Sequence, residues 1–249
     1  MLLFLYESCC YIRSMQLFYN QAITEDTTQF SFSKEESRHI VKVLRKTADD
    51  TLQITNGKGW LFTARIKIAD IKNCVVTIIA KELRIKRDYN LHLAVAPTKM
   101  NDRYEWFLEK ATEIGIDSIT PIICDQSERK FIKSERFEKI LQSALKQSLN
   151  FYLPKLNDTI TFKNFINQDF HGDLFIAHCE NSFKNSLKQL IKPQREITIL
   201  IGPEGDFSEE EREKILSFKR VQPIKINENI LRSETAVISA LSIVSYLIN

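Results

Sequence analysis

Glycine is scarce in this sequence, and the glycine-rich motifs that bind phosphate are missing from it. Only six of the 249 residues are glycine, and they form neither G-x-G-x-x-G nor G-x-x-x-x-G-K-[ST]. These are the short signatures of dinucleotide sites and of nucleoside triphosphate sites. Their absence argues against a nucleotide enzyme that holds its ligand by the phosphates.

Cysteine and histidine also lack the spacing of a metal site. The five cysteines, at positions 9, 10, 74, 124 and 179, form no C-x-x-C pair, and the four histidines do not cluster with them. Cys74 and Cys124 lie in apolar, strand-like segments, so we interpret them as small buried hydrophobes rather than nucleophiles. The pattern predicts a reduced, cytoplasmic protein without a metal.

No apolar run reaches the roughly 18 residues that a membrane-spanning helix needs. The longest candidates are the first dozen residues and Ala236–Ile248. The opening MLLFLYESCCYIRS has neither the basic start nor the cleavage pattern of a secretory signal. We therefore expect no membrane span. Because Met15 precedes the strand-like QLFYN, residues 1–14 are interpreted as an extension or a misassigned start.

Composition is that of a soluble globular protein, with 43% hydrophobic and 27% charged residues. The net charge of +3 is unevenly divided. Residues 1–87 carry 14 Lys and Arg against 9 Asp and Glu, whereas residues 88–249 carry 21 against 23. A basic front half is compatible with a polyanionic partner, and also with an ordinary charged surface.

Residues 15–83 alternate between apolar and polar side chains, which predicts a small β-rich domain with a turn at Asn56-Gly57. Its one clear helix covers KEESRHIVKVLRK, residues 34–46, with Ile40, Val41 and Leu44 able to pack inward. Three basic residues recur on another face of this helix: Arg38, Lys42 and Arg45. That face is suited to RNA phosphate, and an ordinary solvated face explains it equally well.

After a polar linker at residues 84–90, the remaining residues 91–249 alternate between strand and helix patterns. Helices are expected over 103–114, ending at Gly115, and over 135–149, 182–191 and 235–248, with another after residue 208. This alternation predicts an α/β domain with a mostly parallel sheet covered by helices on both faces. Ligands in such sheets bind at the carboxyl ends of strands. Three segments are therefore candidate rims of one site: 177–180, 202–205 and 227–234.

The segment LIGPEGDFSEEERE, residues 200–213, combines a tight turn with a helix start crowded with carboxylates. Ser208 and Glu211 form a capping box, so the free N–H groups of the helix are already satisfied. Glu204 and Asp206 add negative charge that repels phosphate. The turn fits a neutral or partly cationic ligand, or else it is only a turn before a well-capped helix.

The last helix, residues 235–248, is apolar on nearly all sides and interleaved with small residues. A helix of this kind must be enclosed. We predict that a second subunit encloses it in a homodimer; full burial inside one chain is the alternative.

Two stretches together, ILIGPEGDFSEEE at 199–211 and ILRSETAVISAL at 230–241, resemble the SPOUT class of RNA methyltransferases. More closely, the chain resembles the bacterial family that methylates N3 of a uridine in the decoding region of 16S ribosomal RNA. The resemblance covers nearly everything after Met15. It includes RHIVKVLR at 38–45, KMNDRYEWFLEKATEIGIDSITPI at 99–122 and SERK at 127–130.

The resemblance implies a PUA-like β-barrel that binds RNA at residues 15–83 and a SPOUT domain with a trefoil knot at residues 91–249. It also implies a homodimer, S-adenosylmethionine as the methyl donor, and 16S ribosomal RNA or the small ribosomal subunit as the substrate in ribosome biogenesis. Such a cofactor has no phosphate and carries a sulfonium and an ammonium group, which suits the acidic turn.

The resemblance also assigns site residues. Those implied for cofactor binding are Ile201, Gly202, Pro203, Gly205, Ile226, Ile230, Leu231, Thr235 and Ala236, although ordinary core packing explains the apolar ones equally well. We expect Arg232 to stabilise negative charge on the uracil oxygens unless it only pairs with Glu234 or caps the helix. Glu204 is a candidate proton acceptor, or it only shapes the turn. Arg129 joins the three helix residues as a candidate RNA contact.

Two places depart from the family pattern. Asp206-Phe207 stands where the family usually has a further glycine after GPEG. Leu149-Asn150 stands where it commonly has Gly-Arg, which weakens the case for an RNA contact in that segment.

Overall fold

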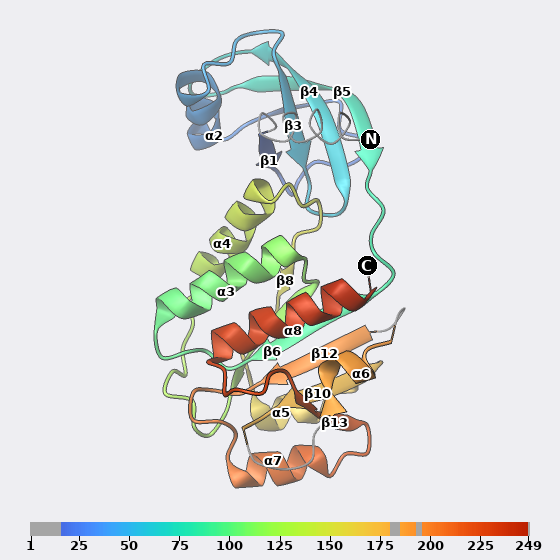
Figure 1. The fold of residues 1–249 in the computed structure, drawn as a ribbon. Helices are drawn as coiled ribbons and strands as arrows, with labels where there is room; N and C mark the ends of the chain where they lie inside the picture. Colours follow the sequence, from blue (N-terminus) through green and yellow to red (C-terminus); the bar gives the residue numbers. More distant parts are fainter. Residues whose placement is uncertain (1–15, 180–184, 193–195, 249) are drawn as a thin grey trace. The chain divides into compact units, whose positions relative to one another are not determined.

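The computed structural model describes residues 16–179, 185–192 and 196–248. The proposed start at Met15 lies outside these ranges. The chain divides into two compact units: residues up to 86 with 145–152 form the first, and residues 87–144 with those from 153 onward form the second. Figure 1 labels the helices and strands of both units.

The first unit is built on a five-stranded sheet with the order β1-β3-β4-β5-β2. Its strands are β1 (Leu17–Tyr19), β2 (Gln29–Ser31), β3 (Thr51–Thr55), β4 (Trp60–Ile68) and β5 (Val75–Leu83). All neighbours are antiparallel except β1 and β3. The alternation seen in the sequence is confirmed, because Phe62, Ala64 and Ile66 of β4 are buried in one core. Gly57 follows Asn56 at φ +72°, as expected for the turn before β4.

The helix expected over residues 34–46 is shorter and less regular than its pattern indicates. Helix α2 spans Lys34–Arg38 and continues as a π-helical turn, η1, over His39–Val43. The inward packing of Ile40, Val41 and Leu44 is confirmed. Ser33 caps α2 by accepting a hydrogen bond from the Glu36 N–H at 3.3 Å.

Residues 145–152 belong to the first unit although they follow it by about sixty positions in the chain. The Gly59 N–H donates to the Phe151 carbonyl at 2.8 Å, and the Tyr152 hydroxyl donates to the Arg84 carbonyl at 2.6 Å. Lys146 Nζ lies 3.3 Å from Glu36 Oε1. No local sequence pattern indicates this grouping, because it depends on contacts distant in sequence.

The second unit contains the predicted parallel sheet. The strands follow the order β11-β13-β10-β12-β6-β7-β8, with β9 also paired to β7, and every described pairing is parallel. They are β6 (Asn90–Val95), β7 (Ser118–Ile123), β8 (Lys155–Leu156), β9 (Ile160–Thr161), β10 (Asp173–Ala177), β11 (Asn185–Ser186), β12 (Glu196–Ile201) and β13 (Val221–Lys225).

Helices cover both faces of this sheet, as predicted. On one face, α3 (Asn101–Ile114), α4 (Ser134–Gln147), α6 (Leu187–Leu190) and α8 (Ser233–Ile248) share a core with Leu91, Leu93 and Val95 of β6. On the other, α5 (Phe162–Ile166) and α7 (Glu209–Leu216) pack on Ala94 and Ala96. Figure 1 shows α3 beside α8. Gly115 ends α3 at φ +99°, with its N–H bonded to the Ala111 carbonyl.

Other expectations need adjustment. The helix expected over 182–191 is only α6, and part of that range lies outside the described residues. The polar stretch 84–90 contains Tyr89, whose side chain is buried in the core of the second unit. Among the described residues, no helix is long and apolar enough to cross a membrane.

The last helix, α8, is enclosed on one side only. Ala236, Val237, Ala240, Leu241 and Val244 are buried against the sheet. Tyr246, by contrast, is 83% exposed, and Thr235 and Ser242 are exposed too. Full burial inside one chain, the alternative to a homodimer, is therefore wrong.

Candidate functional site

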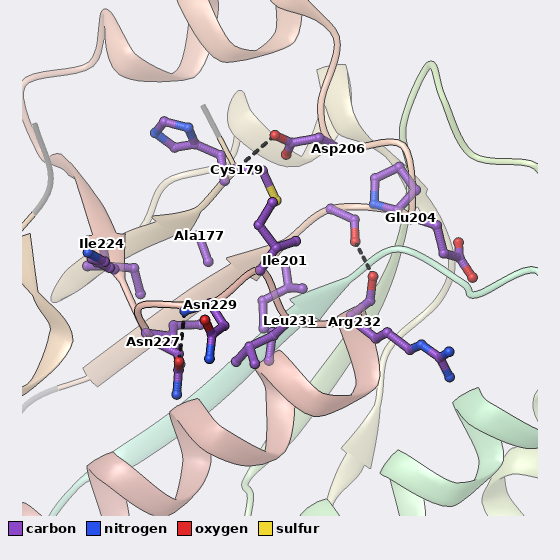
Figure 2. Close-up of a pocket in the computed structure, with 18 of the residues that line it drawn as sticks. Ala177, Cys179, Ile201, Glu204, Asp206, Ile224, Asn227, Asn229, Leu231 and Arg232 are labelled. Atoms are coloured by element: carbon purple, nitrogen blue, oxygen red, sulfur yellow. Dashed lines mark hydrogen bonds between the residues drawn. The ribbon is translucent and has the colours of Figure 1, made fainter. Parts of the chain in front are cut away.

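A cavity of about 850 Å³ lies at the carboxyl ends of β10, β12 and β13, within the second unit. Three segments line it: residues 177–179 after β10, residues 201–204 with Asp206 after β12, and residues 224–233 after β13. Ala236 of α8 completes the wall. The structure thus brings together the three segments that the strand order predicts as rims; Glu180 lies outside the described residues. Figure 2 shows this arrangement.

The GPEG segment forms a tight turn that is held from one side by Asp206. The Asp206 N–H donates to the Pro203 carbonyl at 2.9 Å. Asp206 has φ +66°, a left-handed conformation that glycine adopts without strain. Its carboxylate accepts hydrogen bonds from the Phe207 N–H at 2.9 Å and from the Cys179 N–H at 2.8 Å. Asp206 therefore links the loop after β10 to the turn after β12.

Ser233 holds the same turn from the opposite side. Its hydroxyl donates to the carbonyl oxygen of Gly202 at 3.1 Å, and Ser233 is buried. This contact joins the start of α8 to the turn, as the dashed line in Figure 2 shows. Within the third segment, the Asn229 N–H bonds to Asn227 Oδ1 at 2.9 Å and shapes the loop before α8.

Glu204 has a defined role in the turn. Its Oε1 accepts a hydrogen bond from the Lys99 N–H at 2.9 Å, so the loop after β6 is also held against GPEG. Figure 2 shows Glu204 and Arg232 extending from the rim, whereas Ile201 and Leu231 lie nearer the middle of the view. The observed contact matches the turn-shaping interpretation of Glu204.

The start of α7 is fully capped, as predicted from Ser208 and Glu211. Ser208 Oγ accepts from the Glu211 N–H, and Glu211 accepts from the Ser208 N–H. Glu211 also accepts from the Asp125 N–H at 3.0 Å. Burial raises the pKa of the Glu211 carboxyl in spite of these hydrogen bonds. Because the capping box pairs the Ser208 and Glu211 N–H groups and the first turn carries three glutamates, this helix start is unsuited to phosphate.

Charges around the cavity leave one cation without an ion pair. Lys225 Nζ is paired with Glu228 Oε2 at 2.5 Å. Glu234, which the sequence offers as a structural partner for Arg232, lies 3.7 Å from Arg103 Nε instead. Among the described residues, none forms a hydrogen bond or ion pair with the Arg232 guanidinium. The backbone carbonyl of Arg232 accepts a hydrogen bond from the Ala236 N–H at 2.8 Å, which is the first helical hydrogen bond of α8.

Most of the residues predicted for the site line the cavity. They are Ile201, Gly202, Pro203, Glu204, Ile226, Ile230, Leu231, Arg232 and Ala236. Two do not line it: Thr235 is exposed on α8, and Gly205 faces Gln126. Ile230 is 82% exposed at the lip of the cavity.

Several lining residues had no individual role assigned from the sequence, including His178, Cys179, Asp206 and Ser233. His178, Cys179 and Ser233 lie in the predicted rim segments 177–180 and 227–234, whereas Asp206 lies just after the segment 202–205. Asp206 and Ser233 lie inside the two motifs that carry the resemblance. The sequence signals for them were the predicted rim around Ser233 and the negative charge of Asp206 at the turn.

The candidate RNA-binding residues lie in both units. Arg38, Lys42 and Arg45 are exposed in the first unit, on α2, on η1 and just after η1. In the second unit, Arg129 Nε donates to the Phe131 carbonyl at 2.8 Å. Among the described residues, no group of three or more His, Cys, Asp or Glu side chains is arranged to hold a metal ion.

Comparison with known families gives two matches that follow the two parts of the chain. A model described as the RNA methyltransferase domain matches residues 86–245. A model described as the RNA methyltransferase PUA domain matches residues 32–79.

Relatives of known name match nearly end to end. The chain is 32% identical over 228 residues to ribosomal RNA small subunit methyltransferase E of Buchnera aphidicola, covering 87% of this chain and 88% of that one. It is 30% identical to the protein of the same name from Rickettsia conorii, covering 93% and 95%.

Solved structures have the same fold. A chain described as a probable rRNA-methyltransferase from Porphyromonas gingivalis has a TM-score of 0.87 and 36% identity, covering 94% of this chain and 98% of that one. A Legionella pneumophila protein, described as a methyltransferase in complex with the cofactor SAM, has a TM-score of 0.82 and 26% identity, covering 93% and 97%.

Proposed function

The chain belongs to the RNA methyltransferase family, and we propose that it transfers a methyl group from S-adenosylmethionine to N3 of a specific uridine in 16S ribosomal RNA. The target uridine lies in the decoding region of the small ribosomal subunit. One observation carries this proposal: a single cavity at the carboxyl ends of three parallel strands, lined by both motifs of the resemblance. We also infer that the protein acts in the cytoplasm, because its proposed substrate is ribosomal RNA.

The cavity has the size and chemistry that S-adenosylmethionine requires. A volume of about 850 Å³ is within the range of pockets for ligands of this size. Its apolar walls, from Ile201, Ile226 and Leu231, are suited to an adenine ring. The side chains of Glu204 and Asp206 supply negative charge near the turn, which favours a sulfonium or an ammonium group and disfavours phosphate.

When bound, S-adenosylmethionine supplies an electrophilic methyl group on its sulfonium sulfur. The turn at 202–205 and the loop before α8 would hold the cofactor between them, because Ser233 fixes their separation. Uracil N3 lies on the base-pairing edge, so the target must be unpaired or extruded to reach the cavity. The protein must then align N3 with the methyl carbon and exclude competing water.

Arg232 is the residue that we assign to charge stabilisation. When N3 loses its proton, negative charge spreads onto O2 and O4 of the uracil, and a nearby cation lowers the barrier. Arg232 lines the cavity. It forms no ion pair with any residue that the structure describes, so its guanidinium is available for that charge. Its predicted structural partner, Glu234, is engaged by Arg103.

Glu204 is the proton acceptor in this proposal, acting directly or through water. One carboxylate oxygen accepts from the Lys99 N–H, which fixes the orientation of the group. A carboxylate held in one rotamer at the cavity rim is suited to act as a general base once the uracil ring is bound in the cavity.

We also infer a homodimer. The outward face of α8 carries Thr235, Ser242 and Tyr246, and small or aromatic side chains of this kind pack well against a second helix. Half-buried apolar neighbours, including Ile238 and Ile243, extend this face. A second subunit would cover them and border the site, because the same helix begins at the cavity.

The domain organisation completes the proposal. We infer that residues 15–83 bind RNA through Arg38, Lys42 and Arg45, that residues 84–90 connect the domains, and that residues 91–249 carry the methyl transfer. The trefoil knot is part of the same inference. It is supported by the crossing strand order and by the return of α8 from β13 to pack beside α3.

Isothermal titration of S-adenosylmethionine and, separately, of ATP into the purified protein tests the cofactor. Binding of the first without the second is expected; tight binding of ATP instead would contradict the proposal. Absence of any cofactor binding would favour a cofactor-free RNA-binding assembly protein. Mass spectrometry of 16S RNA from cells with and without the gene then tests the target, because a missing methyl-uridine is expected. A methyl group missing elsewhere in RNA would indicate a different RNA target.

A further inference from the structure

An exposed phenylalanine lies in a basic loop whose first residue, Glu128, pairs with Lys99 next to the GPEG turn, and the proposed methyl transfer assigns this ring no role. Phe131 is 84% exposed, although burying a phenylalanine side chain is strongly favourable. The next residue, Ile132, is half-buried and packs against the core that α3 and α4 share. The backbone thus points one apolar side chain inward and leaves its aromatic neighbour in solvent.

The loop around Phe131 is positively charged. Residues 128–133 contain Arg129, Lys130 and Lys133 against one carboxylate, Glu128. That carboxylate is already paired with Lys99, whose Nζ lies 2.8 Å from Glu128 Oε2. Three cations therefore lie within two sequence positions of Phe131, and the one carboxylate of residues 128–133 is paired with Lys99.

Arg129 fixes the backbone that presents the ring. Its Nε donates to the Phe131 carbonyl at 2.8 Å. Among the described residues, the guanidinium has no other hydrogen bond and no ion pair. Its remaining N–H groups can therefore bind an external anion without breaking the loop.

Three contacts hold the start of this loop against the GPEG turn. Glu128 pairs with Lys99, and the Lys99 N–H donates to Glu204 of the turn. Ser208, just after the turn, donates from its hydroxyl to Asp125 Oδ2 at 2.7 Å. Gln126 lies so close to Gly205 that an added Cβ there would meet its Oε1 at 2.5 Å. The segment 125–128, which leads into the loop, thus lies against the GPEG turn and the residues next to it.

We propose that Phe131 is a stacking residue for an unpaired nucleotide of the RNA substrate, with Arg129, Lys130 and Lys133 bound to the flanking phosphates. Extruding a base for methylation deprives its neighbours of stacking, and an aromatic ring beside the site replaces that contact. Base stacking on aromatic side chains is tolerant of sequence, whereas basic residues track the backbone. The proposal rests on the proposed function only in requiring an RNA substrate.

Fluorescence anisotropy tests the stacking by measuring the affinity for U12, a labelled single-stranded RNA of about twelve uridines, at two KCl concentrations. We expect Phe131→Ala to weaken binding about tenfold or more with an unchanged salt dependence, and Phe131→Trp to bind as tightly as the original protein. Lys130→Ala combined with Lys133→Ala should instead reduce the salt dependence. Leu216→Ala, which removes a partly exposed apolar side chain elsewhere in the second unit, is the matched control and should change neither quantity.

A structural role for the ring predicts different results. Equal U12 binding by Phe131→Ala and the original protein would overturn the proposal, as would full rescue by Phe131→Leu. Loss of methylation on 30S subunits without loss of U12 binding would indicate a protein contact, and conversion of a dimer to monomers would indicate a subunit contact; either result overturns it. Titration of S-adenosylmethionine into Phe131→Ala should be unaffected. Failure of the original protein to bind this cofactor would overturn the proposed function alone.

Discussion

Ser233 Oγ donates a hydrogen bond to the carbonyl oxygen of Gly202 at 3.1 Å, which ties the start of α8 to the turn after β12. Both residues are buried, so the carbonyl has little access to water when this donor is lost. The separation of two of the three cavity rims depends on this single side chain.

Ser233→Ala should therefore weaken S-adenosylmethionine binding by about tenfold, because an unpaired buried carbonyl costs about 1–3 kcal/mol and the rim shifts to find water. Isothermal titration measures the change. Ser217→Ala removes a similar hydroxyl-to-carbonyl bond, of 2.7 Å, at an exposed position just after α7, and should leave the affinity unaltered. An unchanged affinity in Ser233→Ala would mean that the hydrogen bond does not hold the cavity.

The two glycines of the GPEG turn should respond differently to alanine. A Cβ at Gly202 would meet the buried ring of Phe207 at 3.0 Å, and that ring is packed in the core against α5 and α7. A Cβ at Gly205 would meet only the end of the exposed Gln126 side chain, which can move. Gly202→Ala is expected to lower cofactor affinity severalfold, whereas Gly205→Ala is expected to bind as the original does. Equal losses in both variants would contradict the assignment of the cavity wall to Gly202 alone.

Stability should fall in mild acid because of a partly buried histidine, His92, in the sheet. His92 bonds through Nε2 to Thr120 at 2.7 Å, and burial lowers its pKa from 6.5 to about 4. Between these values the unfolded chain takes up a proton that the folded chain does not, so the free energy of unfolding decreases as pH falls from 6.5 toward 4. The full effect is about 3 kcal/mol.

Urea unfolding at several pH values between 7.5 and 4 measures this dependence. His92→Gln should flatten the profile in that window, whereas His171→Gln, at an exposed position, should leave it unchanged. A profile that is equally steep with and without His92 would show that other groups cause the loss.

Leu149 is a candidate for stabilisation. It has φ +54° at the end of α4, where the Asn150 N–H bonds back to the Leu145 carbonyl. This is the left-handed position after a helix that glycine normally fills. Leu149→Gly removes about 1–2 kcal/mol of strain and adds about 0.5–1 kcal/mol of chain entropy cost, so we expect a net gain of roughly 0.5–1 kcal/mol.

Thermal or urea unfolding compares this variant with Ser143→Gly, which lies on an exposed, right-handed turn of the same helix. The second substitution should destabilise, since glycine in a helix interior is unfavourable. Destabilisation by both would mean that the side chain of Leu149 contributes more through packing than its backbone loses through strain.

Local patterns predicted the architecture of the second unit well. The alternation of strands and helices gave the parallel sheet, Ser208 and Glu211 gave the cap of α7, and Gly115 gave the end of α3. These features depend on residues close in sequence, which is why they could be predicted from it. Ligands bind at the carboxyl ends of parallel strands, and this rule predicted that the three cavity segments line one site.

Features that depend on contacts between residues distant in sequence could not be predicted. No pattern indicates that residues 145–152 join the first unit, that Ser233 reaches Gly202, or that His92 bonds to Thr120. Asp206 and Leu149 stand where the resemblance leads us to expect glycine, and both have positive φ. The backbone adopts a conformation that suits glycine at both places, and at Asp206 the carboxylate supplies the link to the Cys179 N–H.

Methyl transfer by the purified protein tests the central claim most directly. Labelled S-adenosylmethionine and 30S subunits from cells lacking the gene are incubated with the original protein or with Arg232→Ala, and the RNA is digested and analysed by mass spectrometry. The account predicts N3-methyluridine at one position with the original protein, and none with Arg232→Ala although its cofactor affinity stays within about tenfold. Incorporation at another atom or nucleoside, or unaltered turnover by Arg232→Ala, would contradict it.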